Sequence, residues 1–303
     1  MTTIVVIIVA YAVILVLGYL GQEKMIYFPT RYTRAVADER AGRLGLALWP
    51  ADAEDYFGLV SAEHPGLVID ESTGLASSES PGHANGDRPC LASSDTLVRL
   101  RGVVLIFHGN AGSATDRFYY VPEIQRLGFR VVLCEYPGYG ARPGSLREAA
   151  LVVDAVQAAR AAIEQFGEPL YVLGESLGCG VATALAARDD IDVRGVVLIT
   201  PWDNLPNLAQ ALYPYVPARL LLRDRYDNIR NLRHYKGPIA VVMAGEDEII
   251  PEKRTMHLFE SLPENKRLWT LHGAGHNNWP AVVDVTWWRE VMDFVSGGGG
   301  RDN

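Results

Sequence analysis

Cysteine is scarce in this sequence, with only Cys90, Cys134 and Cys179 in 303 residues. An odd and widely spaced set does not form the disulfide framework that holds small secreted domains together. Cys134 and Cys179 lie in apolar or glycine-rich stretches, where a buried free thiol is the usual state. The core must therefore come from hydrophobic residues, which make up 49% of the chain. The cysteine pattern leaves the cellular compartment open.

Runs of basic residues are also missing, and the net charge at pH 7 is −8. This composition gives no support for a nucleic-acid partner, which would need clustered Lys and Arg. The glycine-rich turn "FHGNAGS" lacks the Gly-Lys-Ser/Thr and G-x-G-x-x-G patterns of nucleotide-binding loops. His272 and His276 are four residues apart, but no carboxylate or cysteine with ligand spacing accompanies them. We expect neither a metal nor an organic cofactor.

Charge is absent from residues 1–22, and Ile4–Leu17 is almost wholly aliphatic. A helix that crosses a hydrocarbon core of about 30 Å needs about 20 such residues. No basic residue precedes the apolar run, and "VLGYLGQEK" is a poor cleavage site, so an uncleaved transmembrane anchor is favoured over a cleaved signal peptide. Lys24, Arg31 and Arg34 follow the run, and the positive-inside rule then favours a single-pass protein with its large domain on the cytoplasmic side.

The rest of the chain reads as one domain over residues 23–296, followed by a flexible tail over 297–303. Residues 53–62 are expected to form a first strand. Residues 72–95 are rich in Ser, Gly, Pro and Asn, which is typical of a flexible surface insertion. Residues 201–236 are interrupted by four prolines, and we interpret them as a small cap-like excursion over the sheet.

From residue 102 onward, short apolar runs alternate with segments of helical length. The runs are continuous, as expected of parallel strands buried on both faces; they cover 102–109, 129–136, 169–174, 195–200, 238–245 and 266–273. The helical segments cover 115–127, 146–166, 177–188, 251–261 and 280–295. This alternation predicts an α/β fold with a mostly parallel sheet flanked by helices. Sites in such sheets form at the carboxyl ends of the strands.

The stretch "GESLG", residues 174–178, follows one of these strands and opens an Ala-rich helix. It matches the G-x-S-x-G pattern of a nucleophile elbow, a tight strand–turn–helix connection that needs small flanking residues. Gly174 and Gly178 meet that need. A serine that merely caps the helix is the structural alternative. We interpret Ser176 as a nucleophile.

A serine hydroxyl becomes nucleophilic when a base takes its proton. His276 lies in the glycine-rich loop "GAGHNN" after the last expected strand, where its imidazole could reach over the edge of the sheet. The base in turn needs an acid that fixes its tautomer. Asp247 in "GEDEIIP" follows a buried strand and is our first choice, and Asp203 in "TPWDNL" is the competing acid. The order Ser, acid, His is that of one fold family of serine hydrolases and not that of chymotrypsin or subtilisin.

Two further groups of residues complete the expected site. The backbone N–H of Asn110 (or of Ala111) and that of Leu177 would form an oxyanion hole. Tyr139, in the turn "EYPGYG", is expected at the floor of the substrate pocket, and Trp202 on its wall. Other apolar residues of the excursion would extend that lining: Leu205, Leu208, Leu212, Tyr213, Tyr215 and Val216.

Taken together, "FHGNAGS", "EYPGYG", "GESLGCG", "TPWDNL", "LLLRDRYDN", "GEDEIIP" and "GAGHNN" resemble the α/β-hydrolase superfamily. More narrowly they resemble its membrane-anchored Bem46-like branch, which also has an N-terminal span followed by a segment like "QEKMIYFPT". The resemblance implies an eight-stranded sheet whose second strand is antiparallel. It also implies Ser176, Asp247 and His276 as a catalytic triad, with Asn110 and Leu177 as oxyanion donors.

These observations predict a membrane-anchored serine hydrolase that cleaves a small-molecule or lipid ester, or a thioester, through an acyl-enzyme. One alternative is an acyltransferase that uses the same triad with an acceptor other than water. Another is a binding protein on a hydrolase fold without catalysis. A dehalogenase is disfavoured because the elbow would then carry an aspartate.

Overall fold

The computed structural model describes residues 2–51, 55–61 and 100–297. The expected insertion over 72–95, Cys90 and all but the first residue of the expected tail lie outside the described residues.

An eight-stranded sheet forms the centre of the molecule, in the order β10-β9-β8-β7-β4-β6-β3-β2. Its strands are β2 (Leu46–Trp49), β3 (Gly58–Ser61), β4 (Gly102–Phe107), β6 (Phe129–Cys134), β7 (Leu170–Glu175), β8 (Val193–Ile199), β9 (Ile239–Ala244) and β10 (Lys266–Leu271). Strand β3 runs antiparallel to both β2 and β6, and the remaining neighbours pair in parallel. The sheet is therefore mixed but mostly parallel, and the predicted fold class is confirmed.

One sequence interpretation of the sheet is wrong. The stretch 53–62 contains the second strand, β3, and the first is β2, which precedes it. Strand β2 has four residues and pairs with β3 at the sheet edge. So short a run carries too few residues for a periodic signal to distinguish strand from helix.

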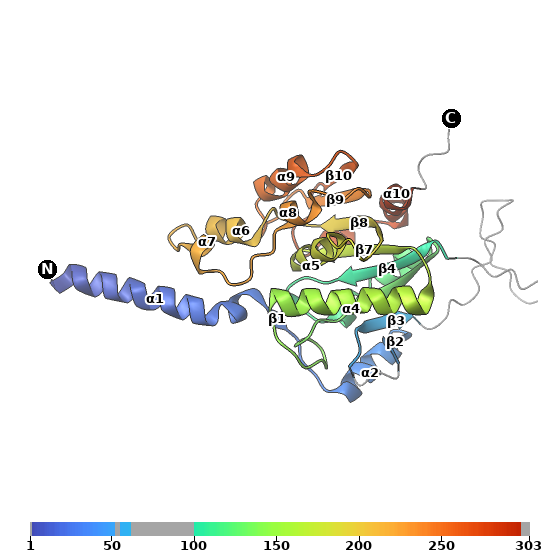
Figure 1. Ribbon diagram of the computed structural model, residues 1–303, viewed down its shortest axis with the longest axis horizontal. Coiled ribbons are helices and arrows are strands. Elements are labelled where there is room, and N and C mark those ends of the chain that lie inside the picture. Colours follow the sequence, from blue (N-terminus) through green and yellow to red (C-terminus); the bar gives the residue numbers. More distant parts are fainter. Residues whose placement is uncertain (1, 52–54, 62–99, 298–303) are drawn as a thin grey trace, which may run out of the picture.

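Helices cover both faces of the sheet (Figure 1). Alternate strand residues such as Val103 and Leu105 pack with α4 (Glu148–Phe166), α5 (Leu177–Ala186) and α9 (Glu252–Ser261). Their neighbours Val104 and Ile106 pack on the opposite face with α2 (Arg34–Arg43), α3 (Tyr120–Gln125) and α10 (Val285–Ser296). Short 3-10 helices at Ala114–Arg117 and Trp279–Val282 precede α3 and α10. The strands β4, β7 and β9 are thus buried at every residue, which explains their continuous apolar sequences.

The 201–236 excursion contains three short helices: α6 (Leu205–Leu212), α7 (Ala218–Leu221) and α8 (Asn228–Leu232). We call the segment from α6 to α7, residues 205–221, the cap. Asn204 caps α6 because its side chain accepts a hydrogen bond from the Asn207 N–H.

The first helix, α1 (Thr2–Ile26), leaves the body of the molecule beside the cap (Figure 1). It is long and apolar enough to cross a membrane, and none of its most apolar window is buried in the protein. The helix ends at Ile26 and is followed by the strand β1 (Phe28–Pro29). This strand pairs with β5 (Ala111–Gly112), which lies in the loop after β4. The N-terminal segment is therefore joined directly to the loop that carries Asn110.

Candidate active site

Ser176 occupies a sharp turn between β7 and α5. Its backbone has φ 51° and ψ −112°, a conformation that costs energy in a non-glycine residue. Ser176 is the N-cap residue of α5, but its side chain makes no hydrogen bond to the first turn, so the hydroxyl does not cap the helix. A Cβ at Gly174 would lie 2.5 Å from the Gly178 carbonyl oxygen, and a Cβ at Gly178 would collide with that of Phe107. Only glycine fits at either flank of the serine.

His276 lies in the loop after β10, and its ring is placed between Ser176 and Asp247. The Nε2 atom is 3.0 Å from the Ser176 Oγ, and the Nδ1 atom is 2.8 Å from an Asp247 carboxylate oxygen. The His276 and Asp247 side chains are 7% and 6% exposed, so water competes little for these contacts. The loop geometry thus brings together the three residues that the sequence selected.

The Asp247 carboxylate is oriented by its own loop. One oxygen accepts hydrogen bonds from the backbone N–H groups of Ile249 and Ile250, at 2.9 and 2.7 Å, while the other faces His276. Two donors on one oxygen leave the second oxygen free to fix the tautomer of the imidazole.

Glu248 is a residue of the site that sequence reasoning missed. Its carboxylate accepts a hydrogen bond from the His276 backbone N–H at 3.0 Å, and this bond lowers the pKa of Glu248. The acid loop therefore holds His276 at two points, through the ring and through the backbone. The flanking acids of "GEDEIIP" were the available signal, but acids are also common where a helix begins.

The competing acid, Asp203, is placed elsewhere. It is fully buried, and one carboxylate oxygen accepts hydrogen bonds from Arg254 at 2.8 Å and from the Asn207 side chain at 3.0 Å. The structure pairs it with a cation of α9 and not with His276. This arrangement favours a structural role for Asp203.

Asn110 is held in position by three hydrogen bonds from different parts of the chain. Its carbonyl oxygen accepts from the Phe28 N–H at 2.8 Å and from the Tyr139 hydroxyl at 2.7 Å. Its side-chain amide donates to the Ile26 carbonyl at 3.0 Å. Tyr139 itself is fully buried and is not among the cavity-lining residues. Its expected place at the pocket floor is therefore wrong, because its hydroxyl is used to support the Asn110 loop.

Two buried carboxylates brace the loops around the serine. Glu135 contacts the His108 ring at 3.1 Å, which agrees with a structural role for that histidine. Glu175 accepts hydrogen bonds from the hydroxyls of Tyr119 and Tyr120, each at 2.7 Å. Burial, together with the nearby Glu175 charge, raises the pKa of both tyrosines, so they remain hydrogen-bond donors. The sequence offered no signal for the Glu175 network, because its members come from separate elements.

A cavity of 630 Å³ opens next to these residues. Ser176, His276, Asn110 and Leu177 are among its lining residues, and Trp202 lines it as expected. The remaining lining is mostly apolar and comes from the cap and from α1. From the cap it includes Leu205, Leu208, Leu212, Tyr213 and Val216, whereas Tyr215 is 89% exposed and lies outside the lining. Among the residues that the structure describes, no three His, Cys, Asp or Glu side chains are grouped as metal ligands.

Known proteins with similar sequences and structures identify the family. A model of the α/β hydrolase fold matches residues 102–234. An uncharacterized protein of Mycobacterium tuberculosis is 34% identical over 199 residues, covering 63% of this chain and 67% of that protein. The chain belongs to the α/β-hydrolase family.

Further relatives place it within that family. Lysophosphatidylserine lipase ABHD12 of Danio rerio is 29% identical, covering 55% of this chain and 48% of the lipase. Protein bem46 of Schizosaccharomyces pombe is 28% identical, covering 52% of this chain and 56% of that protein. The chain therefore belongs to the Bem46 and ABHD12 branch, and it spans about half the length of these two relatives. A solved Pyrococcus furiosus esterase, with TM-score 0.55 and 15% identity over 65% of this chain and 82% of its own, shares the fold.

Proposed function

We propose that this hydrolase is a serine esterase or lipase that acts on carboxylic esters with apolar acyl chains. The observation that carries the proposal is the chain of contacts from Ser176 through His276 to Asp247, at 3.0 and 2.8 Å, beside an apolar cavity. A nucleophile in contact with a base, which is itself oriented by an acid, is the arrangement that activates a serine for acyl transfer. The relationship to a lysophosphatidylserine lipase supports a lipid ester as substrate.

In the proposed mechanism, Ser176 Oγ attacks the ester carbonyl carbon as His276 takes its proton. The negative charge that develops on the carbonyl oxygen is stabilised by the N–H groups of Asn110 and Leu177, which border the same cavity as the serine. The C–O bond to the alcohol then breaks, and the imidazolium returns the proton to the leaving alcohol. A water molecule, activated by His276 in the same way, cleaves the acyl-enzyme and releases the acid.

We also propose that α1 anchors the protein in a membrane as a single span. Its most apolar window has no buried residue, and each large aliphatic side chain left in water would forfeit about 1.5–3 kcal/mol. The cations Lys24, Arg31 and Arg34 follow the span and support a catalytic domain on the cytoplasmic side. The domain limits expected from the sequence, 1–22 and 23–296, belong to this proposal; the helix itself continues to Ile26.

A fluorophosphonate probe, which reacts with activated serines, tests the chemistry. The wild-type protein and a Ser261→Ala control, changed at an exposed serine of α9, should label equally. Ser176→Ala should not label while its thermal unfolding stays that of a folded protein. Equal labelling of Ser176→Ala would contradict the proposal, and mapping the labelled peptide would show which serine reacts.

A further inference from the structure

One wall of the active-site cavity is made by α1 itself. Seven residues of its second half line the cavity together with Ser176 and His276, namely Ile14, Leu15, Gly18, Tyr19, Gln22, Met25 and Ile26. At a rise of 1.5 Å per residue, the wall from Ile14 to Met25 is about 16 Å long. The opposite wall is the cap. The cavity therefore continues from the catalytic serine along the helix that is proposed to enter the bilayer.

The contact between α1 and the segment after the cap is specific. Gln22 is only 5% exposed and is the buried residue of α1. Its side chain donates to the Leu221 carbonyl at 3.3 Å and accepts from the Arg223 N–H at 2.8 Å. Arg223 also lies over the Tyr19 ring at 4.3 Å and donates to the Tyr19 carbonyl at 3.0 Å. These contacts fix one face of the helix against the end of the cap and the residues that follow it.

The other faces of α1 remain uncovered by protein. Ile7, Ile8 and Leu17 are 62%, 62% and 63% exposed. On the cap, Tyr215 and Leu220 are 89% and 83% exposed, and the Tyr215 carbonyl accepts a hydrogen bond from Tyr11 of α1 at 2.7 Å. Helix α1 thus borders the cavity on one side and exposes apolar side chains on its other sides. The neighbouring cap likewise lines the cavity and exposes apolar side chains.

We propose that α1 and the cap form an acyl-binding groove that receives a membrane lipid ester sideways from the bilayer. The occupant is one acyl chain, which lies between α1 and the cap with its ester carbonyl at Ser176. The length agrees, because half of a hydrocarbon core of about 30 Å is about 15 Å, the depth of one leaflet. This inference rests on the proposed esterase function and adds that the anchor is part of the substrate site.

Two glycines of α1 give a matched pair of variants. A Cβ at either Gly18 or Gly21 would meet no atom within 4 Å, but only Gly18 lines the cavity. Gly18→Phe should fill the groove, and Gly21→Phe should place the same ring outside it. Full-length proteins in phosphatidylcholine vesicles would be assayed with 4-nitrophenyl acetate and 4-nitrophenyl palmitate. We expect Gly18→Phe to lower the ratio of palmitate to acetate kcat/KM by about tenfold or more, and Gly21→Phe to keep the wild-type ratio.

The result also separates this inference from the proposed function. An equal ratio in wild type, Gly18→Phe and Gly21→Phe, with Ser176 still labelled by fluorophosphonate, would overturn the groove and leave the esterase intact. Failure of wild type to label would instead contradict the esterase. If Gly18→Phe does not insert or fold, a hexadecyl fluorophosphonate with a terminal diazirine provides a second measurement on wild type. After irradiation it should cross-link Ser176 to a peptide of α1, and cross-links that avoid both α1 and the cap would overturn the groove.

Discussion

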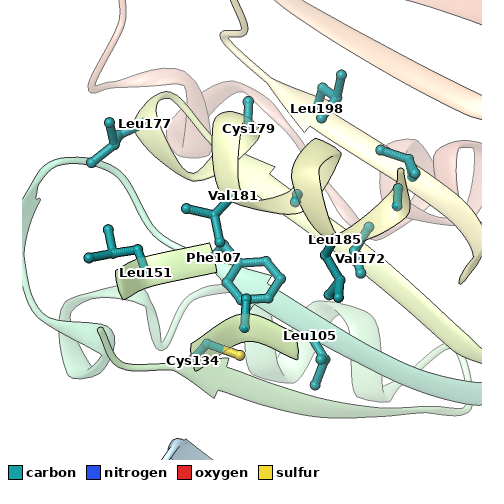
Figure 2. Packing of buried hydrophobic residues seen from close by; sticks show 14 of the residues in the cluster. Leu105, Phe107, Cys134, Leu151, Val172, Leu177, Cys179, Val181, Leu185 and Leu198 are labelled. Carbon is teal, nitrogen blue, oxygen red and sulfur yellow. The ribbon is translucent and has the colours of Figure 1, made fainter. Parts of the chain in front are cut away.

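The helices α1 and α5 are both strongly apolar, and both border the active-site cavity, yet α5 is buried in the protein and α1 is largely exposed. All but one of the ten residues of α5 are buried, whereas Gln22 is the buried residue of α1. Figure 2 shows Leu177, Cys179, Val181 and Leu185 of α5 packed among side chains of the surrounding strands. Helix α1 projects from the body instead (Figure 1).

Side-chain size explains the difference. Helix α5 has glycine where its neighbours approach most closely, since a Cβ at Gly178 would collide with the Phe107 backbone of β4 and one at Gly180 would lie 2.5 Å from the Tyr226 ring. Close packing holds the N-terminus of α5, and with it Ser176, in a fixed position. The bulky Ile, Val and Leu side chains of α1 find no such surface in the protein. Apolarity alone therefore does not bury a helix; α5 is buried because a closely fitting surface meets its glycines, whereas Gly18 and Gly21 of α1 meet open space.

The strongest test of the α5 end of the cavity is Asp247→Asn. Because the amide cannot hold His276 in the productive tautomer, kcat/KM should fall by about 10⁴-fold for short and long esters alike. Fluorophosphonate labelling should slow in parallel, with little change in the unfolding temperature.

Asp203→Asn provides the comparison for that prediction. It should affect turnover far less and should lower the unfolding temperature more, since Arg254 would lose its buried carboxylate partner. A larger loss of turnover in Asp203→Asn than in Asp247→Asn would mean that the acid acts from the loop after β8.

The packing difference between the helices can be tested with one methyl group. Gly178→Ala should lower the free energy of unfolding by about 3 kcal/mol, because the Cβ collides with the Phe107 carbonyl. Gly18→Ala, in open space on α1, should leave it unchanged or raise it by less than about 1 kcal/mol. Denaturant unfolding in detergent would measure both, and equal effects would contradict this difference between α1 and α5.

The parts of the fold and site that the sequence predicted have local causes. The central strands β4, β7 and β9 are buried at every residue and so carry continuous apolar runs. Ser176 was identifiable because its turn needs Gly174 and Gly178 within the same five residues. His276 and Asp247 were identifiable because each follows a strand at the same edge of the sheet.

The parts that could not be predicted depend on contacts between distant segments. Strand β2 is defined by its pairing with β3, and Tyr139 by a hydrogen bond to Asn110. The cavity wall on α1 depends on contacts about 200 residues apart in sequence, such as that between Gln22 and Leu221. Hydropathy shows that α1 is long and apolar enough to cross a membrane, but it gives no sign of which face meets the cap.

Removal of α1 should separate its two proposed roles. The full chain should remain with membranes through carbonate extraction, and a chain beginning near Glu23 should be soluble, because the exposed apolar surface is gone. The shortened chain should still label at Ser176 but lose most of its preference for long esters, since the wall from Ile14 to Gln22 is missing. Release of a naturally shortened, soluble protein by the cell would show that the segment is a signal peptide.

The smallest expected effect is at Trp202, on the part of the cavity wall that belongs to the body of the protein. Its side chain is 2% exposed, lines the cavity and lies 6.3 Å from the Tyr226 ring. Trp202→Ala should flatten the rise of kcat/KM from acetyl to medium-chain esters, by roughly fourfold for each methylene group of the acyl chain that the indole no longer buries. Because Trp202 also packs against Tyr226, the unfolding temperature should fall as well.

Trp202→Phe, which keeps a ring at this position, should retain most of the chain-length preference and most of the unfolding temperature. If Trp202→Ala lowers the unfolding temperature but slows all esters by the same factor, Trp202 acts only in packing, and recognition of the acyl chain rests with α1 and the cap.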